Sequence, residues 1–86
     1  MIVLSDHARE QAARRGLSED IVLAVARKPE QRLVIRPARE IRQSRVEMQP
    51  EGMVYLVRVV IDVAPTAETV VTVYRTSKID KYWSKA

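Results

Sequence analysis

The longest β-forming run of the chain is Met53-Val54-Tyr55-Leu56-Val57-Arg58-Val59-Val60-Ile61, in which Arg58 is the only charged residue. Valine, isoleucine and tyrosine favour strands, so this run predicts a long strand. Two expected turns bound it, at residues 49–52 (Gln-Pro-Glu-Gly) and 64–67 (Ala-Pro-Thr-Ala). Beyond the second turn, residues 69–75 (Thr-Val-Val-Thr-Val-Tyr-Arg) predict the next strand.

The residues before the first turn are less uniform. Residues 33–35 (Leu-Val-Ile) predict a short strand. Residues 37–48 contain good helix formers after a proline, but Ile41, Val46 and Met48 do not form one apolar helical face. We interpret them as a strand, because strands on both sides and short connections favour a meander.

Two helices are expected at the N-terminal end of the chain. Ser5 or Asp6 is a suitable N-cap for the first helix, and Gly16 can end it in the left-handed conformation. Ser18 is a suitable N-cap for the second helix, which Pro29 stops. Acidic residues follow Ser18 directly, where the helix dipole favours them.

Together these elements predict a single α+β domain over residues 1–86. Its two N-terminal helices, the first over residues 7–15, pack on one face of a three- to four-stranded antiparallel sheet, in the order α-α-β-β-β-β. Residues 77–83 are expected to end the chain as a short helical turn or an irregular tail. The other face of the sheet, or a groove along its edge, is then left for function.

The composition excludes several kinds of site. The 86 residues include no cysteine and one histidine, which rules out disulfides, thiolate metal sites and multi-histidine zinc sites. No phosphate-binding glycine loop, nucleophile elbow or metal motif is present, so no cofactor or metal is expected. No apolar run is long enough for a membrane span, and the N-terminus does not read as a secretory signal. We therefore expect a cytoplasmic, non-membrane protein.

The positive charge is concentrated in two segments. The chain carries a formal net charge of +4, and 11 of its 15 cationic residues are arginine, which binds phosphate in a planar fork. Residues 27–45 hold seven cations against two acids, and residues 75–86 hold four against one. A basic surface of this kind suggests RNA or an acidic protein as the partner, although it can also be a solvated face.

Three segments carry a family resemblance: Ser5-Asp6-His7-Ala8 followed by Arg15-Gly16-Leu17-Ser18, then Val57-Arg58-Val59-Val60, then Val70-Val71-Thr72-Val73-Tyr74. They resemble a family of small uncharacterised prokaryotic domains with the pattern S-x-H-A, R-G-L-S, R-V-V and V-V-T-V-Y. At the level of fold that family is similar to RelE-like and barnase/EndoU-like toxin nucleases. The resemblance implies a small α+β domain that cleaves RNA without a metal and is held by an acidic antitoxin.

Metal-free RNA cleavage needs proton-transfer groups and fixed cations. His7 has a reference pKa of about 6.5 and lies at a helix N-terminus, which favours its neutral form and attracts phosphate. Its alternative role is packing or capping. Arg58 interrupts an apolar run and needs a partner, which is a substrate phosphate, an acid such as Glu47, or a helix C-terminal carbonyl.

Aromatic and cationic residues alternate near the C-terminal end, as a surface for single-stranded RNA requires. Tyr74 is expected to share a polar strand face with Val70 and Thr72, while Val71 and Val73 face the other way. Four further candidates for binding phosphate or stacking on a base are Arg75, Lys78, Lys81 and Tyr82. Tyr82 and Trp83 can instead pin the tail to the core. In a strand, the arginines at positions 36, 39, 42 and 45 divide between both faces. At a loop and strand edge they form a diffuse phosphate-attracting rim, or they receive an acidic antitoxin segment.

Three functions remain open. The first is a metal-independent, RelE-like endoribonuclease, an mRNA-interferase-like toxin, in which His7, Arg58 and Tyr74 line one groove. The second is a non-catalytic binding module for RNA or an acidic protein, with His7 packed away from the cations. The third is an interaction domain that dimerises through a strand edge. The chain is expected to be a monomer or a homodimer.

Overall fold

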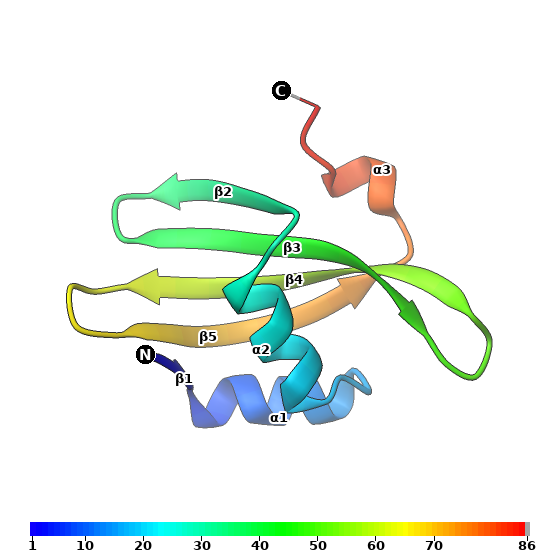
Figure 1. Ribbon diagram of the computed structural model, residues 1–86, viewed down its shortest axis with the longest axis horizontal. Coiled ribbons are helices and arrows are strands. Elements are labelled where there is room, and N and C mark those ends of the chain that lie inside the picture. Colours follow the sequence, from blue (N-terminus) through cyan, green and yellow to red (C-terminus); the bar gives the residue numbers. More distant parts are fainter. Residues whose placement is uncertain (86) are drawn as a thin grey trace.

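The computed structural model describes residues 1–85 and contains a five-stranded sheet with three helices (Figure 1). The spatial order of the strands is β1-β5-β4-β3-β2. In chain order the elements are β1 (Ile2–Leu4), α1 (Asp6–Arg14), α2 (Glu19–Arg27), β2 (Gln31–Arg36), β3 (Arg39–Met48), β4 (Met53–Val63), β5 (Glu68–Thr76) and α3 (Ile79–Tyr82). The α+β class, the two N-terminal helices and the four consecutive strands are confirmed.

The expected long strand is β4, the central strand of the sheet. The ambiguous segment before it is strand β3, which pairs antiparallel with β4 over its whole length, from Arg39 opposite Asp62 to Met48 opposite Met53. The turn expected between them is present: the Gly52 N–H donates to the Met48 carbonyl at 3.0 Å, and Gly52 adopts a φ of +72°. A positive φ there is accessible to glycine without steric cost.

The prediction of three to four antiparallel strands was wrong by one element, β1. Its three residues pair parallel with β5, from Ile2 opposite Glu68 to Leu4 opposite Val70, so the sheet is five-stranded and mixed. Three residues are too few to show a periodic pattern. The strand exists through this pairing, and Leu4 is buried against the core.

Both N-terminal helices have the expected ends. Ser5 is the N-cap of α1: its hydroxyl oxygen accepts from the Ala8 N–H at 3.0 Å. The same hydroxyl donates to the Val71 carbonyl on β5 at 3.3 Å, which ties the start of the helix to the sheet. Gly16 has a φ of +66° and follows the last turn of α1, as expected of a C-terminal glycine. Ser18 caps α2 through the Ile21 N–H.

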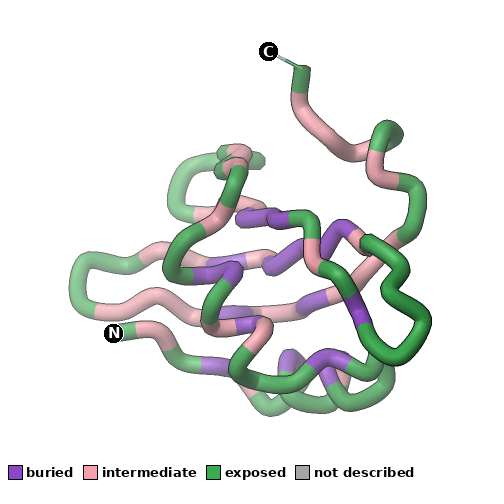
Figure 2. Tube along the Cα trace, turned by 45° about the vertical axis from the view of Figure 1, so that its right-hand side comes forward, coloured by how far each residue is buried: buried purple, intermediate pink, exposed green. Residues whose placement is uncertain are grey.

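Helices α1 and α2 cover the same face of the sheet (Figure 1), which we call the helix-bearing face. On β4 this face carries Val57, Val59 and Ile61, which are all fully buried in the core cluster. Figure 2 shows buried stretches both in these helices and in the strands of the sheet. Side chains alternate along a strand, so Arg58 and Val60 point to the opposite face, which we call the open face.

A β-bulge corrects the predicted alternation of β5. Val60 pairs with Thr72, but Ile61 pairs with Val70, so Val71 is an additional residue at this point. Both Val70 and Val73 therefore reach the core and are buried to 0% and 1% exposure. The expectation that Val70 shares a face with Thr72 was wrong, because strict alternation holds only without a bulge.

Because residues 39–48 form a strand, the arginines divide between its two faces, as expected for a strand. Arg39 and Arg45 lie on the open face, whereas Arg42 lies on the helix-bearing face and is not part of an exposed rim. It is 2% exposed on the helix-bearing side, where it donates to Glu40, to Glu68 and to the Ala26 carbonyl at the end of α2. The hydrogen bonds from Arg42 hold the pKa of Glu68 below its usual value. For Glu40 burial acts to raise the pKa, but hydrogen bonds from Arg42 and Arg32 outweigh it and lower the pKa.

Candidate functional site

Arg58 lies near the middle of β4 with its side chain on the open face. Its residue exposure is 7%, so the guanidinium is held within the fold. The Nε–H donates to the Gln43 side-chain oxygen on β3 at 2.8 Å, and Nη1 donates to the Tyr74 hydroxyl on β5. Gln43 and Tyr74 are the register partners of Arg58 on the two flanking strands. Arg58 is thus oriented by one neutral side chain from each of the two neighbouring strands.

No carboxylate balances this buried cation within the described residues. None of the ion pairs found over residues 1–85 includes Arg58. Its hydrogen-bonded neighbours are bound through Nε and Nη1, and Nη2 has no hydrogen-bond partner among residues 1–85. Burying a charge without a counter-charge is costly, and the groups that contact the guanidinium in place of a carboxylate include the Tyr74 and Tyr82 rings, 5.5 Å and 4.5 Å from its central carbon.

The C-terminal segment packs beside Arg58. The Tyr82 ring lies 4.5 Å from the Arg58 guanidinium carbon, on the end of α3. Gln43 donates to the Tyr82 carbonyl at 3.1 Å, and Gln31 on β2 donates to the Ser84 carbonyl at 2.7 Å. The expected short helical turn is therefore present, and it lies on the open face rather than with α1 and α2.

Arg45 and the lysines of α3 surround this cluster. The Arg45 guanidinium lies 4.4 Å from the centre of the Trp83 ring and also forms a bidentate ion pair with Glu30. This pairing lowers the pKa of Glu30 to about 2. Lys81 lies 5.4 Å from the Tyr82 ring and is exposed, as is Lys78. The charge of Arg45 is thus balanced by Glu30, whereas Lys78 and Lys81 have no ion-pair partner among residues 1–85.

Two predicted site residues lie elsewhere. His7 is exposed in the first turn of α1, on the helix-bearing side of the sheet. Arg75 pairs with Val57, so it too faces that side, and its guanidinium lies 4.4 Å from the Tyr55 ring. The structure therefore brings Arg58, Tyr74, Tyr82 and Arg45 together, and it separates His7 and Arg75 from them. The single groove expected for His7, Arg58 and Tyr74 is not formed.

Gln43 is the site residue that the sequence interpretation missed. It is fully buried, and it contacts Arg58, Gln31 and Tyr82. The partner suggested for Arg58, Glu47, instead lies opposite Val54 near the end of the hairpin. Counting outward from the turn at residues 49–52 places residue 43 opposite residue 58, so the register of the predicted hairpin was the signal that could have identified Gln43.

Metal-ligating groups do not gather at this site. Among the described residues, no cluster of three or more histidine, cysteine, aspartate or glutamate side chains could hold a metal ion. Over the same residues, none of the helices has the length and apolar character that crossing a membrane requires.

Comparison with known proteins identifies one family. Residues 4–75 match the profile of the family described as "Domain of unknown function (DUF4258)", from the last residue of β1 to the last but one of β5. The chain belongs to the DUF4258 family. No curated protein matches the chain, and no solved structure does. The matched region of this DUF4258 domain includes Arg58, Gln43 and Tyr74, whereas Tyr82 and Trp83 lie beyond it. The family description names no activity, so a function must be argued from the site.

Proposed function

We propose that this DUF4258 domain is a metal-independent, RelE-like endoribonuclease whose site is the open face around Arg58. The observation that supports the proposal is the buried Arg58 guanidinium, which has no carboxylate partner among residues 1–85 and is oriented by two neutral side chains. An anion that enters a site of this kind supplies a charge pairing that these residues do not. RNA offers a phosphodiester for Arg58 and bases for the aromatic rings beside it.

The proposed reaction is an internal transesterification of RNA. The 2′-hydroxyl oxygen forms a bond to the adjacent phosphorus, the bond from phosphorus to the 5′-oxygen breaks, and the products are a 2′,3′-cyclic phosphate and a 5′-hydroxyl. The proton of the 2′-hydroxyl passes to water, and the Tyr74 hydroxyl gives a proton to the 5′-oxygen and regains one from water. Arg58 stabilises the charge of the phosphorane. Tyr74 takes the proton-transfer role that the sequence suggested for His7.

The second candidate is a non-catalytic module that binds RNA or an acidic protein, such as an antitoxin, through the same face. The position of His7 favours it. His7 is the only histidine of the chain, and it lies on the helix-bearing side, so no imidazole is available at Arg58. A face that has cations and aromatic rings but no histidine is suited to binding.

Cleavage of single-stranded RNA in the presence of EDTA tests the proposal. Two variants remove one function each: Arg58→Met keeps the length of the side chain without its charge, and Tyr74→Phe removes only the hydroxyl. Loss of one preorganised donor typically costs about 100-fold or more in rate, so both variants are expected to lose at least that much. Arg14→Gln is the matched control, because Arg14 is exposed on α1 and pairs with Glu10 on the same helix.

The products and the variants decide between the candidates. Fragments with 2′,3′-cyclic phosphate ends that disappear in Arg58→Met and Tyr74→Phe, but not in Arg14→Gln, support the ribonuclease. Binding of intact RNA without cleavage overturns it in favour of the binding module. Circular dichroism and thermal melts of each variant show whether a loss reflects the site or the fold. Induced expression of the wild type beside Tyr74→Phe, with growth and total RNA followed, tests the toxin character.

A further inference from the structure

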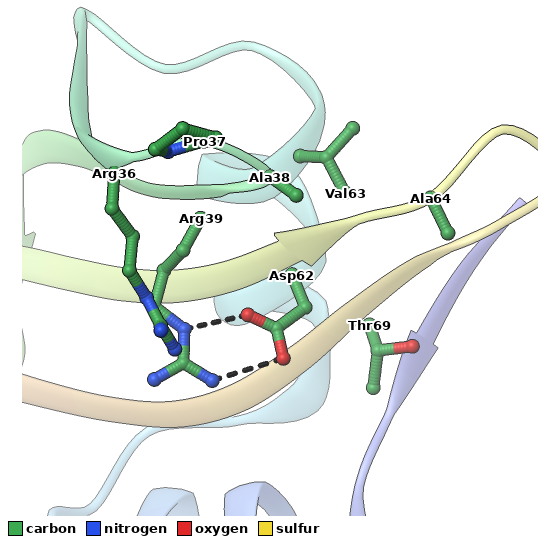
Figure 3. A pocket seen from close by; sticks show the side chains of 8 residues that line it. All are labelled: Arg36, Pro37, Ala38, Arg39, Asp62, Val63, Ala64 and Thr69. Atoms are coloured by element: carbon green, nitrogen blue, oxygen red, sulfur yellow. Dashed lines mark hydrogen bonds and ion pairs between the residues drawn. The ribbon is translucent and has the colours of Figure 1, made fainter.

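A second cationic site lies at the other end of the open face. A pocket of about 350 Å³ forms where the β2–β3 turn meets the ends of β4 and β5. Arg36 and Arg39 line it together with Asp62 and Thr69. Figure 3 shows the two arginine side chains side by side in front of the strands, with the helices behind.

The charges in this pocket are unequal. Arg39 and Asp62 are register partners and form a bidentate ion pair, with Nε to Oδ1 at 2.6 Å and Nη2 to Oδ2 at 2.9 Å. Arg36 is exposed and has no ion-pair partner within residues 1–85. Arg39 hydrogen bonding and the nearby charge of Arg36 both lower the pKa of Asp62. The pocket therefore contains two guanidinium groups but one carboxylate, which pairs with Arg39, and the positive charge of Arg36 remains.

This pocket and Arg58 lie on the same face of β4. Asp62 follows Arg58 by four residues on β4, and side chains an even number of residues apart share a face. At about 3.3 Å per residue the two positions lie about 13 Å apart along the strand. The open-face residues between them are Val60 on β4, Ile41 opposite it on β3 and Thr72 opposite it on β5, all partly exposed. A surface of two aliphatic side chains and one threonine, with no charge, thus separates two cationic positions.

We propose that the Arg36–Arg39 pocket is a second phosphate subsite, which holds the same RNA strand that Arg58 contacts. This inference rests on the proposed function, because it takes RNA as the ligand. At a stacked rise of about 3.4 Å per nucleotide, 13 Å corresponds to about four nucleotides, and a stretched strand needs fewer. The riboses and bases between the two phosphates lie over Ile41 and Val60. Asp62 pairs with Nε and Nη2 of Arg39 and so competes with the phosphate for this guanidinium, of which Nη1 remains available.

Binding of two uncleavable strands tests this arrangement. The probes are a fluorescein-labelled 2′-O-methyl dinucleotide and the corresponding octanucleotide, which lack the attacking hydroxyl, and binding is read by fluorescence anisotropy. Arg36→Gln is expected to weaken octanucleotide binding several-fold and to reduce the slope of log affinity against log salt by about 0.7, the loss of one phosphate contact. The dinucleotide is too short to reach both sites, so its affinity does not change. Arg14→Gln is the control.

A second variant is expected to change the affinity for the octanucleotide in the opposite direction. Asp62→Asn removes the carboxylate that competes for Arg39, so octanucleotide binding is expected to strengthen, which a general loss of structure would not produce. Octanucleotide binding that needs Arg58 but is unchanged in Arg36→Gln overturns the second subsite and leaves the proposed function intact. If the wild type binds neither strand, the proposed function fails and the subsite fails with it. If only an acidic peptide binds at these arginines, the RNA assignment is wrong.

Discussion

Gln43 and Arg58 lie opposite each other on β3 and β4, and the Gln43 side-chain oxygen accepts the Arg58 Nε–H at 2.8 Å. The Gln43 amide nitrogen donates to Gln31 and to the Tyr82 carbonyl. One fully buried amide therefore orients Arg58 and holds the C-terminal segment on the open face. Because glutamine is neutral, it fixes the guanidinium without neutralising its charge.

Gln43→Leu is expected to destabilise the protein by about 1–3 kcal/mol, because the Arg58 Nε–H and the Tyr82 carbonyl lose their buried partner. Urea unfolding followed by circular dichroism measures the change in free energy. The double variant Gln43→Leu/Arg58→Met removes both sides of one hydrogen bond, and its loss is expected to be smaller than the sum of the two single losses. Additive losses would show that the two side chains are not coupled.

Acid is expected to unfold the protein through its arginine-bound carboxyl groups. The pKa values of Glu30, Glu40, Asp62 and Glu68 are all lowered in the folded protein, that of Glu30 from 4.5 to about 2. The unfolded chain therefore binds more protons, so stability is full above the usual carboxyl pKa and is lost as the pH falls from about 5 toward 2. Thermal melts from neutral pH to pH 2 measure this loss.

The Glu68→Gln variant measures how much of the loss of stability in acid comes from Glu68. Glu68→Gln removes one titrating partner of Arg42, so it is expected to lower the melting temperature at neutral pH and to flatten its dependence on pH. Glu10→Gln is the matched control, because Glu10 is an exposed residue of α1 that pairs with Arg14. An equal pH dependence in wild type and Glu68→Gln would contradict the role given to the Arg42 network.

The elements of the fold were predictable where a local signal marks them. Ser5 and Gly16 bound the first helix through capping chemistry that reads directly from the sequence. The run at residues 53–61 marks β4, because a long β-forming segment between turn residues has few alternatives. By contrast, β1 depends on its pairing with β5, and the bulge at Val71 depends on how two strands meet. Neither has a signal in its own residues.

The candidate site was predictable for Arg58 and Tyr74 but not for His7. An arginine inside an apolar strand is unusual and must find polar partners. In the structure these partners are Gln43 and Tyr74 on the two neighbouring strands. A histidine at a helix N-terminus is chemically suitable wherever the helix lies, so its residue type cannot show which face of the sheet it occupies. That information comes from the tertiary packing of α1 against β5.

His7→Ala is expected to leave RNA binding and cleavage unchanged, because His7 is exposed on the helix-bearing side and Arg58 is on the open face. Its effect on stability is expected to stay within about 0.5 kcal/mol, as is usual for an exposed site. Cleavage assays beside Tyr74→Phe measure the first effect, and urea unfolding measures the second. A large loss of cleavage in folded His7→Ala would contradict a site centred on Arg58 and Tyr74.

Trp83 is the only tryptophan of the chain, and its ring lies 4.4 Å from the Arg45 guanidinium, so its fluorescence reports on the open face. Arg45→Ala uncovers one side of the ring and is expected to shift the emission to longer wavelength, with a loss of about 0.5–1 kcal/mol in stability from the lost cation–π contact.

RNA that occupies the face beside Tyr82 is expected to change the Trp83 emission in the wild type. Titration of the uncleavable octanucleotide measures this change, with Arg58→Met as the variant that loses it and Arg14→Gln as the variant that keeps it. An emission change that persists in Arg58→Met would place the RNA at Trp83 without Arg58, and the site would then have to be centred on the C-terminal segment.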